Sequence, residues 1–233
     1  MGISLHLAMT AAEIAVCDSL PERLAYMACH FSPYSTGLSN IPDRLPFGSM
    51  LILNDRTPIC GHDPKLISYQ LCEAVETLQC DSMLLDFQRP DSQEVQSLCK
   101  ILTAELPCPV AVSHIYAKDL DCPVFLPPCP PDTPPAEHLQ PWADRVIWLD
   151  AARDAVRVVV TQSGSSLSYQ PIPDKSELPH WDESLFCHNR TDISVDSVAF
   201  TIARTGEDLF SLLQHAEKFG VNKAIGLWQD LHT

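Results

Sequence analysis

Short apolar segments alternate with amphipathic helical segments along most of this chain, which predicts an α/β protein with a compact (β/α)8 TIM-like barrel. The 233 residues fall slightly short of the roughly 250 that such a barrel usually needs, so some helices should be reduced. Hydrophobic residues make up 45% of the sequence, which is enough for a large core. We therefore expect a single barrel domain over residues 1–233.

Eight segments have the length and composition of barrel strands. Each is apolar over most of its length, and most of them end in polar residues. The predicted strands are residues 24–30, 49–54, 82–88, 109–116, 122–126, 145–150, 197–204 and 223–229. An open parallel sheet is the alternative arrangement of the same elements.

Capping residues mark the starts of three helices between these strands. Asp63 and Pro64 place an N-cap and a proline at the first helical position. The segments 91–94 (DSQE) and 205–208 (TGED) both resemble capping boxes. Gly220 follows the last amphipathic segment, where a C-terminal cap is expected.

Two segments depart from the alternating pattern. Residues 155–161 and 167–170 flank a short Gly/Ser turn and predict a β-hairpin, within an inserted hairpin and loop region at about 154–190. The proline-rich segment 127–135 (PPCPPDTPP) predicts a stiff loop around the barrel mouth, with a ligand for a proline-binding protein as the alternative.

The charge balance excludes some partners. The chain has 15 basic and 30 acidic residues, a net charge of −15, and no basic patch, so we expect no nucleic-acid partner. No segment reaches eighteen uninterrupted apolar residues, and no basic residue precedes Arg23, as a signal peptide would require. We therefore expect no membrane partner and a cytoplasmic location, whereas the oligomeric state stays open.

We also expect neither a cofactor nor a metal. The chain has only eight glycines, and neither a dinucleotide-binding nor a phosphate-binding glycine motif is present. The ten cysteines form no Cys-x-x-Cys pair and several lie in apolar runs, which predicts free, mostly buried thiols. The alternative is a zinc site drawn from residues with no known zinc spacing, namely Cys29, His30, Cys60, His62, Cys187 and His188.

A ligand site in a parallel barrel lies at the carboxyl ends of the strands. The polar residues at the predicted ends are His30, Asn54, Asp55, Arg56, Asp86, Gln88, Arg89, His114, Tyr116, Asp150, Arg204, Trp228, Gln229 and Asp230. We select as ligand-binding candidates Asp86, Gln88, Arg89, His114, Tyr116, Asp150, Arg204, Trp228 and Gln229. A carbohydrate or a small polar ligand suits such a set.

The segment 84–88 (LLDFQ) is the most informative. Side-chain alternation turns Met83, Leu85 and Phe87 toward the helices, and Asp86 and Gln88 into the barrel mouth. The segment resembles the strand of glycoside hydrolase family 18 barrels, including spore-germination and chitinase-like members, that ends in Asp-x-Asp-x-Glu. By this resemblance Asp86 matches the second Asp, while Leu84 replaces the first Asp and Gln88 the catalytic Glu.

The end of the chain resembles the same family. Its barrels close with a Trp that floors the sugar subsite, and residues 226–228 (GLW) fit if Ala224, Gly226 and Trp228 face the interior. The resemblance covers residues 48–90 and 197–230. It implies a glycosidase-like barrel that binds carbohydrate but has lost hydrolysis, because an amide cannot protonate the leaving oxygen.

Two other functions remain open from the residues alone. One is an enzyme of another class that uses His114, Asp86 and Asp150 as acid–base groups on a small metabolite. The other is a structural or partner-binding barrel without a small ligand.

Overall fold

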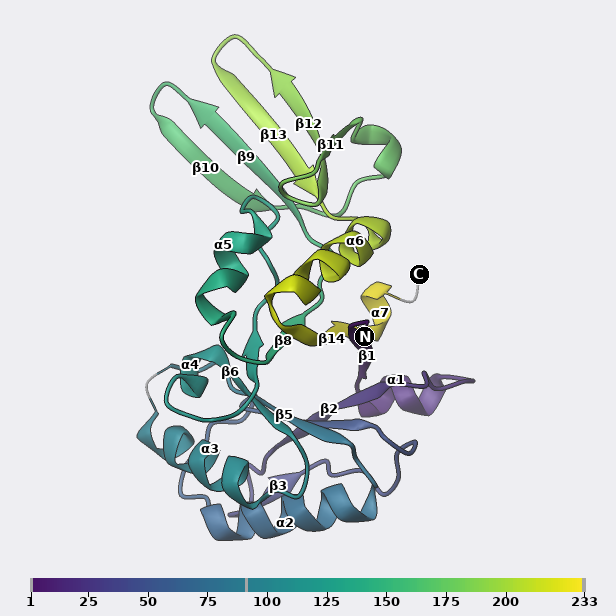
Figure 1. Cartoon of the computed structure of the whole chain (residues 1–233), viewed down its shortest axis with the longest axis vertical. Helices are drawn as coiled ribbons and strands as arrows, with labels where there is room; N and C mark the ends of the chain where they lie inside the picture. The colour runs from purple at the N-terminus through teal and green to yellow at the C-terminus, as the bar shows by residue number, and fades with distance from the viewer. Residues whose placement is uncertain (1, 91, 232–233) are drawn as a thin grey trace.

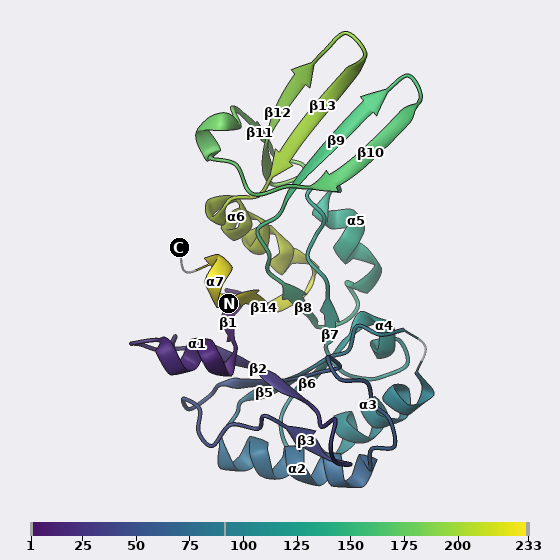
Figure 2. The same cartoon turned by 180° about the vertical axis from the view of Figure 1, so that it is seen from behind.

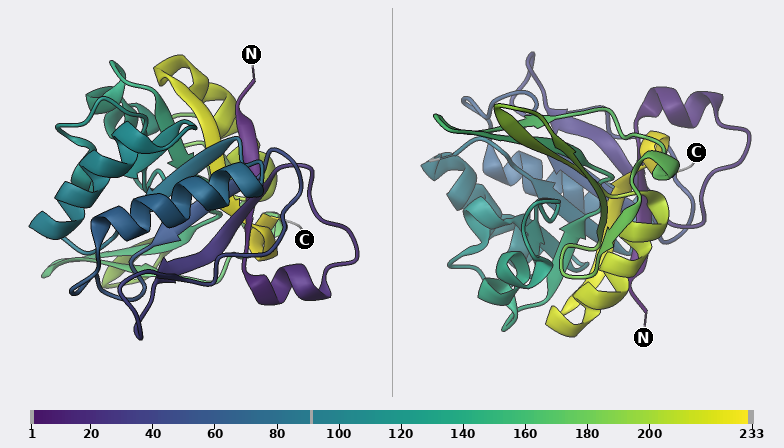
Figure 3. Two further views of the ribbon diagram at one scale, coloured as in Figure 1. Left: turned by 90° about the horizontal axis from the view of Figure 1, so that it is seen from below. Right: turned by 90° about the horizontal axis from the view of Figure 1, so that it is seen from above.

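Eight parallel strands form a closed barrel in the computed structural model, which describes residues 2–90 and 92–231 (Figures 1 and 3). The strands, in barrel order, are β1 (Ser4–Met9), β14 (Val221–Leu227), β8 (Ile147–Asp150), β7 (Val124–Leu126), β6 (Val110–Ser113), β5 (Ser82–Asp86), β4 (Met50–Asn54) and β2 (Leu24–Phe31). Parallel pairing of β1 with both β14 and β2 closes the barrel, and β3 (Leu38–Ser39) adds antiparallel to β2. The predicted fold class is confirmed.

The helices are reduced, as expected for so short a barrel. Only α2 (Pro64–Thr77), α3 (Gln93–Glu105) and α6 (Gly206–Ala216) exceed two turns. The shorter elements are α1 (Ala11–Val16), α4 (His114–Ala117), α5 (Pro135–Leu139), η1 (Gln140–Trp142), η2 (Lys175–Glu177), η3 (Glu217–Phe219) and α7 (Trp228–Leu231). No helix of the described residues is long and apolar enough to cross a membrane.

The helix caps follow the sequence closely. Asp63 accepts a hydrogen bond from the Lys65 amide at 2.9 Å, and Asp208 accepts one from the Thr205 amide at 2.9 Å. For α3 the cap is Ser92, whose hydroxyl accepts from the Val95 amide, while Asp91 lies outside the described residues. The C-terminal cap at Gly220 is confirmed by its φ of 91°, a conformation that favours glycine.

The barrel strands bury both faces. Outward-facing residues such as Met83, Leu85 and Phe87 pack in one large core with the helices. Inward-facing residues fill the barrel interior, which contains Ala8, Ala25, Met50, Ile52, Leu84, Ala111, Phe125, Trp148 and Ile225. The predicted alternation of β5 is therefore confirmed.

Residues between β8 and α6 form a second, antiparallel sheet in the order β10-β9-β13-β12-β11. Its strands are β9 (Ala155–Thr161), β10 (Gly164–Tyr169), β11 (His180–Asp182), β12 (Cys187–Ile193) and β13 (Ser197–Ala203). The predicted hairpin is the β9–β10 pair, and the sheet projects from one end of the barrel (Figures 1 and 2).

Two sequence predictions about barrel strands are wrong. Segment 197–204 belongs to the antiparallel sheet, where β13 pairs with β9 and β12, so the insertion extends past residue 190. The eighth barrel strand is instead β1, which lies before the first predicted strand. Alternating apolar residues look alike in both kinds of sheet, and only long-range pairing distinguishes them.

The predicted facing of the closing strand is also wrong. Ile225 points into the barrel beside Trp148, whereas Ala224 packs on the helix side. A Cβ atom at Gly226 would lie 2.7 Å from the Ala151 carbonyl oxygen and closer still to the Leu231 side chain. The small residues of β14 therefore serve close approach of the neighbouring backbone and of α7, not space for an aromatic ring inside the barrel.

Candidate functional site

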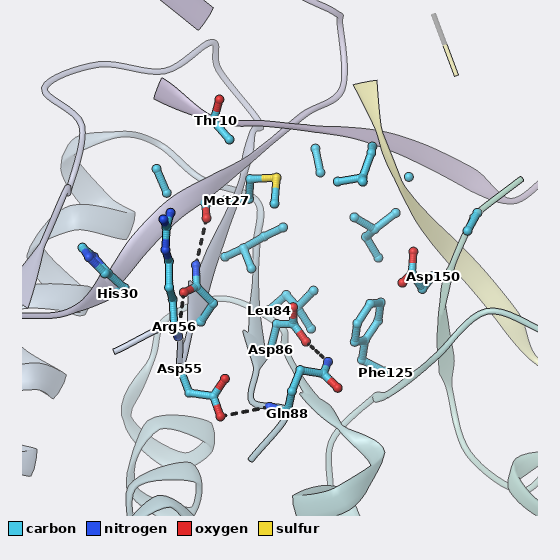
Figure 4. A pocket seen from close by; sticks show the side chains of 18 of the residues that line it. Thr10, Met27, His30, Asp55, Arg56, Leu84, Asp86, Gln88, Phe125 and Asp150 are labelled. Carbon is cyan, nitrogen blue, oxygen red and sulfur yellow. Dashed lines mark hydrogen bonds between the residues drawn. The ribbon is translucent and has the colours of Figure 1, made fainter. Parts of the chain in front are cut away.

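A cavity of about 590 Å³ opens at the carboxyl ends of the barrel strands. Its walls come from β1, β2, β4, β5, β7, β8 and β14 and from the residues that follow these strands (Figure 4). The residues that line it are Ala8, Thr10, Ala11, Ala12, Met27, Ala28, His30, Asn40, Ile52, Asn54, Asp55, Arg56, Leu84, Asp86, Gln88, Phe125, Asp150, Ala151, Ala152, Ile225, Gly226, Leu227 and Asp230.

The floor of the cavity is apolar, because the interior core of the barrel ends there. Ile52, Leu84, Phe125 and Ile225 belong both to that core and to the cavity wall. Polar side chains share the wall with them, and in Figure 4 the Phe125 ring lies between Asp86 and Asp150. An apolar floor with a few convergent polar groups is the usual composition of a small-molecule site.

Asp86 ends β5 and is held by its neighbours. The Gln88 side-chain amide donates a hydrogen bond to Asp86 Oδ1, and the Ser113 hydroxyl lies 3.4 Å from the same oxygen. Burial raises the pKa of Asp86, and the charge of Asp55 adds to this, while the two hydrogen bonds oppose it. The carboxylate is thus costly to ionise but geometrically restrained.

Asp55 fixes the segment that follows β5. This buried side chain accepts hydrogen bonds from the Gln88 amide at 3.0 Å and the Arg89 amide at 2.8 Å. Asn54 beside it donates from Nδ2 to the Met27 carbonyl at 2.8 Å. These contacts hold the Gln88 backbone at the rim of the cavity.

Asp150, at the end of β8, has the most perturbed acidity in the cavity. Burial, followed by the charges of Asp86, Asp154 and Asp230, raises its pKa to about 7. Asp154 also has a raised pKa, mainly through burial. Near neutral pH, Asp150 therefore exchanges between the acid and the carboxylate, as a general acid or base must.

The structure brings three of the nine selected candidates into the cavity wall, namely Asp86, Gln88 and Asp150. Five further strand-end residues of the wider set also line it, namely His30, Asn54, Asp55, Arg56 and Asp230. The rule that ligands meet at the carboxyl ends of parallel strands thus selects much of the polar lining.

The other six candidates lie outside the lining. Arg204 is fully buried and donates to the carbonyls of Cys129 at 2.7 Å, Leu185 at 3.2 Å and Phe186 at 3.4 Å. Its guanidinium joins the proline-rich loop to the antiparallel sheet.

The remaining five lie in the segments that follow β5, β6 and β14. Tyr116 is buried in the helix-side core and donates from its hydroxyl to the Arg89 carbonyl. Arg89 in turn donates to the Arg56 carbonyl at 3.1 Å, and His114 meets the Trp142 ring edge-on. Trp228 and Gln229 belong to α7, which turns away from the strand direction directly after β14.

Sequence reasoning missed the cavity residues that follow β1. Thr10, Ala11 and Ala12 line the wall because the chain turns there from β1 into α1. The signal was present in the sequence, since Glu13 accepts from the Thr10 amide at 2.7 Å and completes a capping box. That cap marks the end of the preceding strand.

The side chains that bind metals in proteins do not come together in the part of the chain that the structure describes. No group of three or more His, Cys, Asp or Glu side chains with metal-site geometry occurs among residues 2–90 and 92–231. All ten cysteines lie in these ranges and have free thiols, five of them buried. Burial raises the pKa of Cys29 and of Cys99 to about 12, so these thiols stay protonated.

Neither a family model nor a curated protein matches this sequence. Solved structures do match. The chitinase-like agglutinin RobpsCRA from Robinia pseudoacacia has a TM-score of 0.60 and 11% identity, covering 95% of this chain and 93% of its own. The Bacillus cereus spore cortex-lytic enzyme SleL has a TM-score of 0.58 and 9% identity, covering 97% and 70%.

A third structure is a family 18 chitinase from Cycas revoluta in complex with (GlcNAc)4. It is a mutant in which a glycine is replaced by tryptophan and a glutamate by glutamine. Its TM-score is 0.57 at 9% identity, covering 96% of this chain and 94% of its own. The chain therefore has the barrel fold of family 18 glycoside hydrolases, and at these identities the likeness concerns the fold alone.

Proposed function

We propose that this protein binds a carbohydrate in the cavity at the carboxyl ends of its barrel strands and does not hydrolyse it. The observation that carries the proposal is Gln88, an amide at the cavity wall that donates to Asp86. A glycosidase needs a carboxylic acid to protonate the leaving oxygen, and an amide has no such proton to give.

The shape and chemistry of the cavity support a sugar as the ligand. A volume of about 590 Å³ has room for one or a few pyranose rings. The Phe125 ring and Leu84 provide an apolar surface for a ring face, and Asp86, Gln88 and Asn54 provide hydrogen-bonding groups for hydroxyls. The Cycas revoluta mutant holds (GlcNAc)4 although one of its glutamates is a glutamine.

The charge of the wall narrows the class of sugar. Among the described residues that line the cavity, four are aspartates and Arg56 is the one arginine. A negatively charged sugar would meet repulsion in a partly buried site. A neutral N-acetylated sugar, or one with a free amine, is therefore the expected ligand, and an acidic sugar is not.

Calorimetric titration with (GlcNAc)3 and (GlcNAc)4 tests the binding. Leu227→Trp, which fills the cavity mouth, should weaken binding at least about tenfold, since it removes the space for the ligand. Gln229→Trp is the matched control, because Gln229 is exposed and outside the lining. Equal binding by both variants, or no binding by the wild type, contradicts the proposal.

The loss of hydrolysis is tested separately. The wild type should not turn over a chromogenic N-acetylglucosamine oligomer. The variant for comparison is Gln88→Glu, which restores a carboxyl group at the position of the amide. Clear wild-type turnover that Asp86→Asn abolishes would show that a different group supplies the proton.

A second candidate function rests on Asp150. A carboxyl group with a pKa of about 7, in the same cavity as Asp86, suits acid–base chemistry on a small metabolite. His114 is no partner in it, since it lies outside the lining. A reaction rate with a bell-shaped or sigmoidal pH dependence near pH 7, abolished by Asp150→Asn, would favour this enzymatic function over binding alone.

A cytoplasmic location belongs to the same proposal. Ten free thiols, several of them inside the core, are typical of proteins that fold under reducing conditions. Fractionation of the host cells with an antibody against the chain tests this location directly.

A further inference from the structure

The antiparallel sheet has one uncharged face that is built across four strands. The strand registers place on one side the alternate residues of β9 and their cross-strand partners on β10, β13 and β12. This apolar face consists of Val156, Val158, Val160, Ser165, Leu167, Tyr169, Asn189, Thr191, Ile193, Val198, Phe200 and Ile202. None of these side chains carries a charge.

The outer part of the apolar face is open to solvent. Its most exposed large apolar members are Ile193 at 81% and Tyr169 at 73%, followed by Leu167 at 48% and Val160 at 43%. The β9–β10 and β12–β13 hairpins extend well beyond the barrel (Figures 1 and 2). A contiguous apolar surface of several hundred Å² on a folded protein usually marks a site of contact with another molecule.

The opposite face of the same sheet has the composition of a solvated surface. Arg157 pairs with Asp192 at 3.1 Å, and Arg190 lies 3.3 Å from the same carboxylate. Ser166 and Ser168 occupy the edge strand on this side. An antiparallel sheet usually turns its polar face to water and its apolar face to a core, but Val156 is the one buried residue among the twelve of this apolar face, so most of the face has no core over it.

We propose that a second copy of this chain covers the apolar face, so that two antiparallel sheets pack face to face. Two-fold symmetry brings the same uncharged side chains together, which lets two copies that each carry a net charge of −15 meet without repulsion at the contact. Sheets packed in this way lie about 10 Å apart and interdigitate their side chains.

The size of the face agrees with a weak dimer. Four strands about 4.8 Å apart, with six residues rising about 3.3 Å each, give roughly 400 Å² in projection per copy before side-chain relief is counted. Stable interfaces begin at about 600 Å² of accessible surface per partner. The apolar face approaches that lower limit, so we expect dissociation in the micromolar range.

Sedimentation velocity of the full chain over about 1–200 µM tests the proposal, with the concentration range chosen for that affinity. The wild type should shift from the 25.8 kDa monomer to twice that mass. Leu167→Glu places a charge on the apolar face and should raise the dissociation constant at least about tenfold. Ser166→Glu, on the next residue of the same exposed strand but the opposite face, should leave the dimer unchanged.

Each other outcome overturns the proposal. If the wild type stays monomeric at the highest concentration, the chain does not self-associate and the proposed dimer does not exist. Equal effects of the two glutamates would place the contact elsewhere than on the apolar face. Flotation with phosphatidylcholine vesicles that carry the wild type but not Leu167→Glu would identify the apolar face as a lipid contact instead. Circular dichroism spectra of both variants verify that the fold is retained.

Discussion

The Asp150→Asn substitution should stabilise this protein at pH 8 and have little effect below pH 4. Asp150 has a pKa of about 7 in the folded state, against 3.8 without the fold. The folded state therefore keeps a proton that the unfolded chain releases as the pH rises from about 4 to 7. Stability is lost across this window, and the loss is complete once Asp150 ionises in the folded state as well.

The magnitude follows from the two pKa values. A rise from 3.8 to about 7 corresponds to at most about 4 kcal/mol against the ionised form. Residual solvent at the cavity mouth reduces this, so we expect Asn to add about 1–3 kcal/mol to the free energy of unfolding at pH 8. Because Asp86 is the charge that raises the pKa of Asp150 most, Asp86→Asn should lower that pKa and reduce the gain in stability.

Urea unfolding of the wild type and Asp150→Asn at pH 4, 6 and 8 measures the effect. Asp144→Asn is the matched control, since Asp144 is exposed and outside the cavity. The difference between Asp150→Asn and the wild type should grow from about zero at pH 4 to its full value at pH 8. An Asp150→Asn protein that is no more stable than the control at pH 8 would refute the burial argument.

Two further predictions concern the backbone and the thiols. Gly220→Ala should lower the free energy of unfolding, measured by thermal unfolding, by about 1–3 kcal/mol, because φ is 91° and the new Cβ would lie 2.9 Å from the Arg145 carbonyl oxygen. Gly206→Ala is the control, since Gly206 lies at the start of α6 with open space around it, and this substitution should not lower the stability. In a thiol titration at pH 8, the exposed Cys60 should react first and Cys60→Ser should remove that fast phase, whereas the buried thiols should react only in denaturant.

The central part of the barrel was predictable because the residue pattern determines which face of each strand is apolar. Along β5 and the two residues after it, the apolar Met83, Leu85 and Phe87 alternate with residues that become polar at Asp86 and Gln88. This single switch determines which face meets the helices and which reaches the cavity. The capped starts of α2 and α6 then separate the strands and make their carboxyl ends coincide.

The first strand escaped prediction for a physical reason. β1 contains His6, which is an unusual residue for a buried barrel strand, yet only 1% of it is exposed and burial lowers its pKa. The segment 197–203 has the stronger apolar alternation and lies before a capped helix, so it resembles the missing strand. Whether such a segment joins the barrel depends on which distant strands it can pair with, and sequence alone does not contain that information.

Under the proposed function, an amide at position 88 does more than withhold a proton. The Gln88 amide does not titrate, and its hydrogen bond to Asp86 holds the pair in one arrangement. A glutamate at the same place would have to share a proton with Asp86, because two carboxylates in contact cannot both ionise without a large cost. That shared proton is what a hydrolase would pass to its leaving group. If the proposed function is right, the same residue thus both withholds the acid and donates a hydrogen bond from a group that does not titrate, which favours a site that holds a sugar over a site with weakened catalysis.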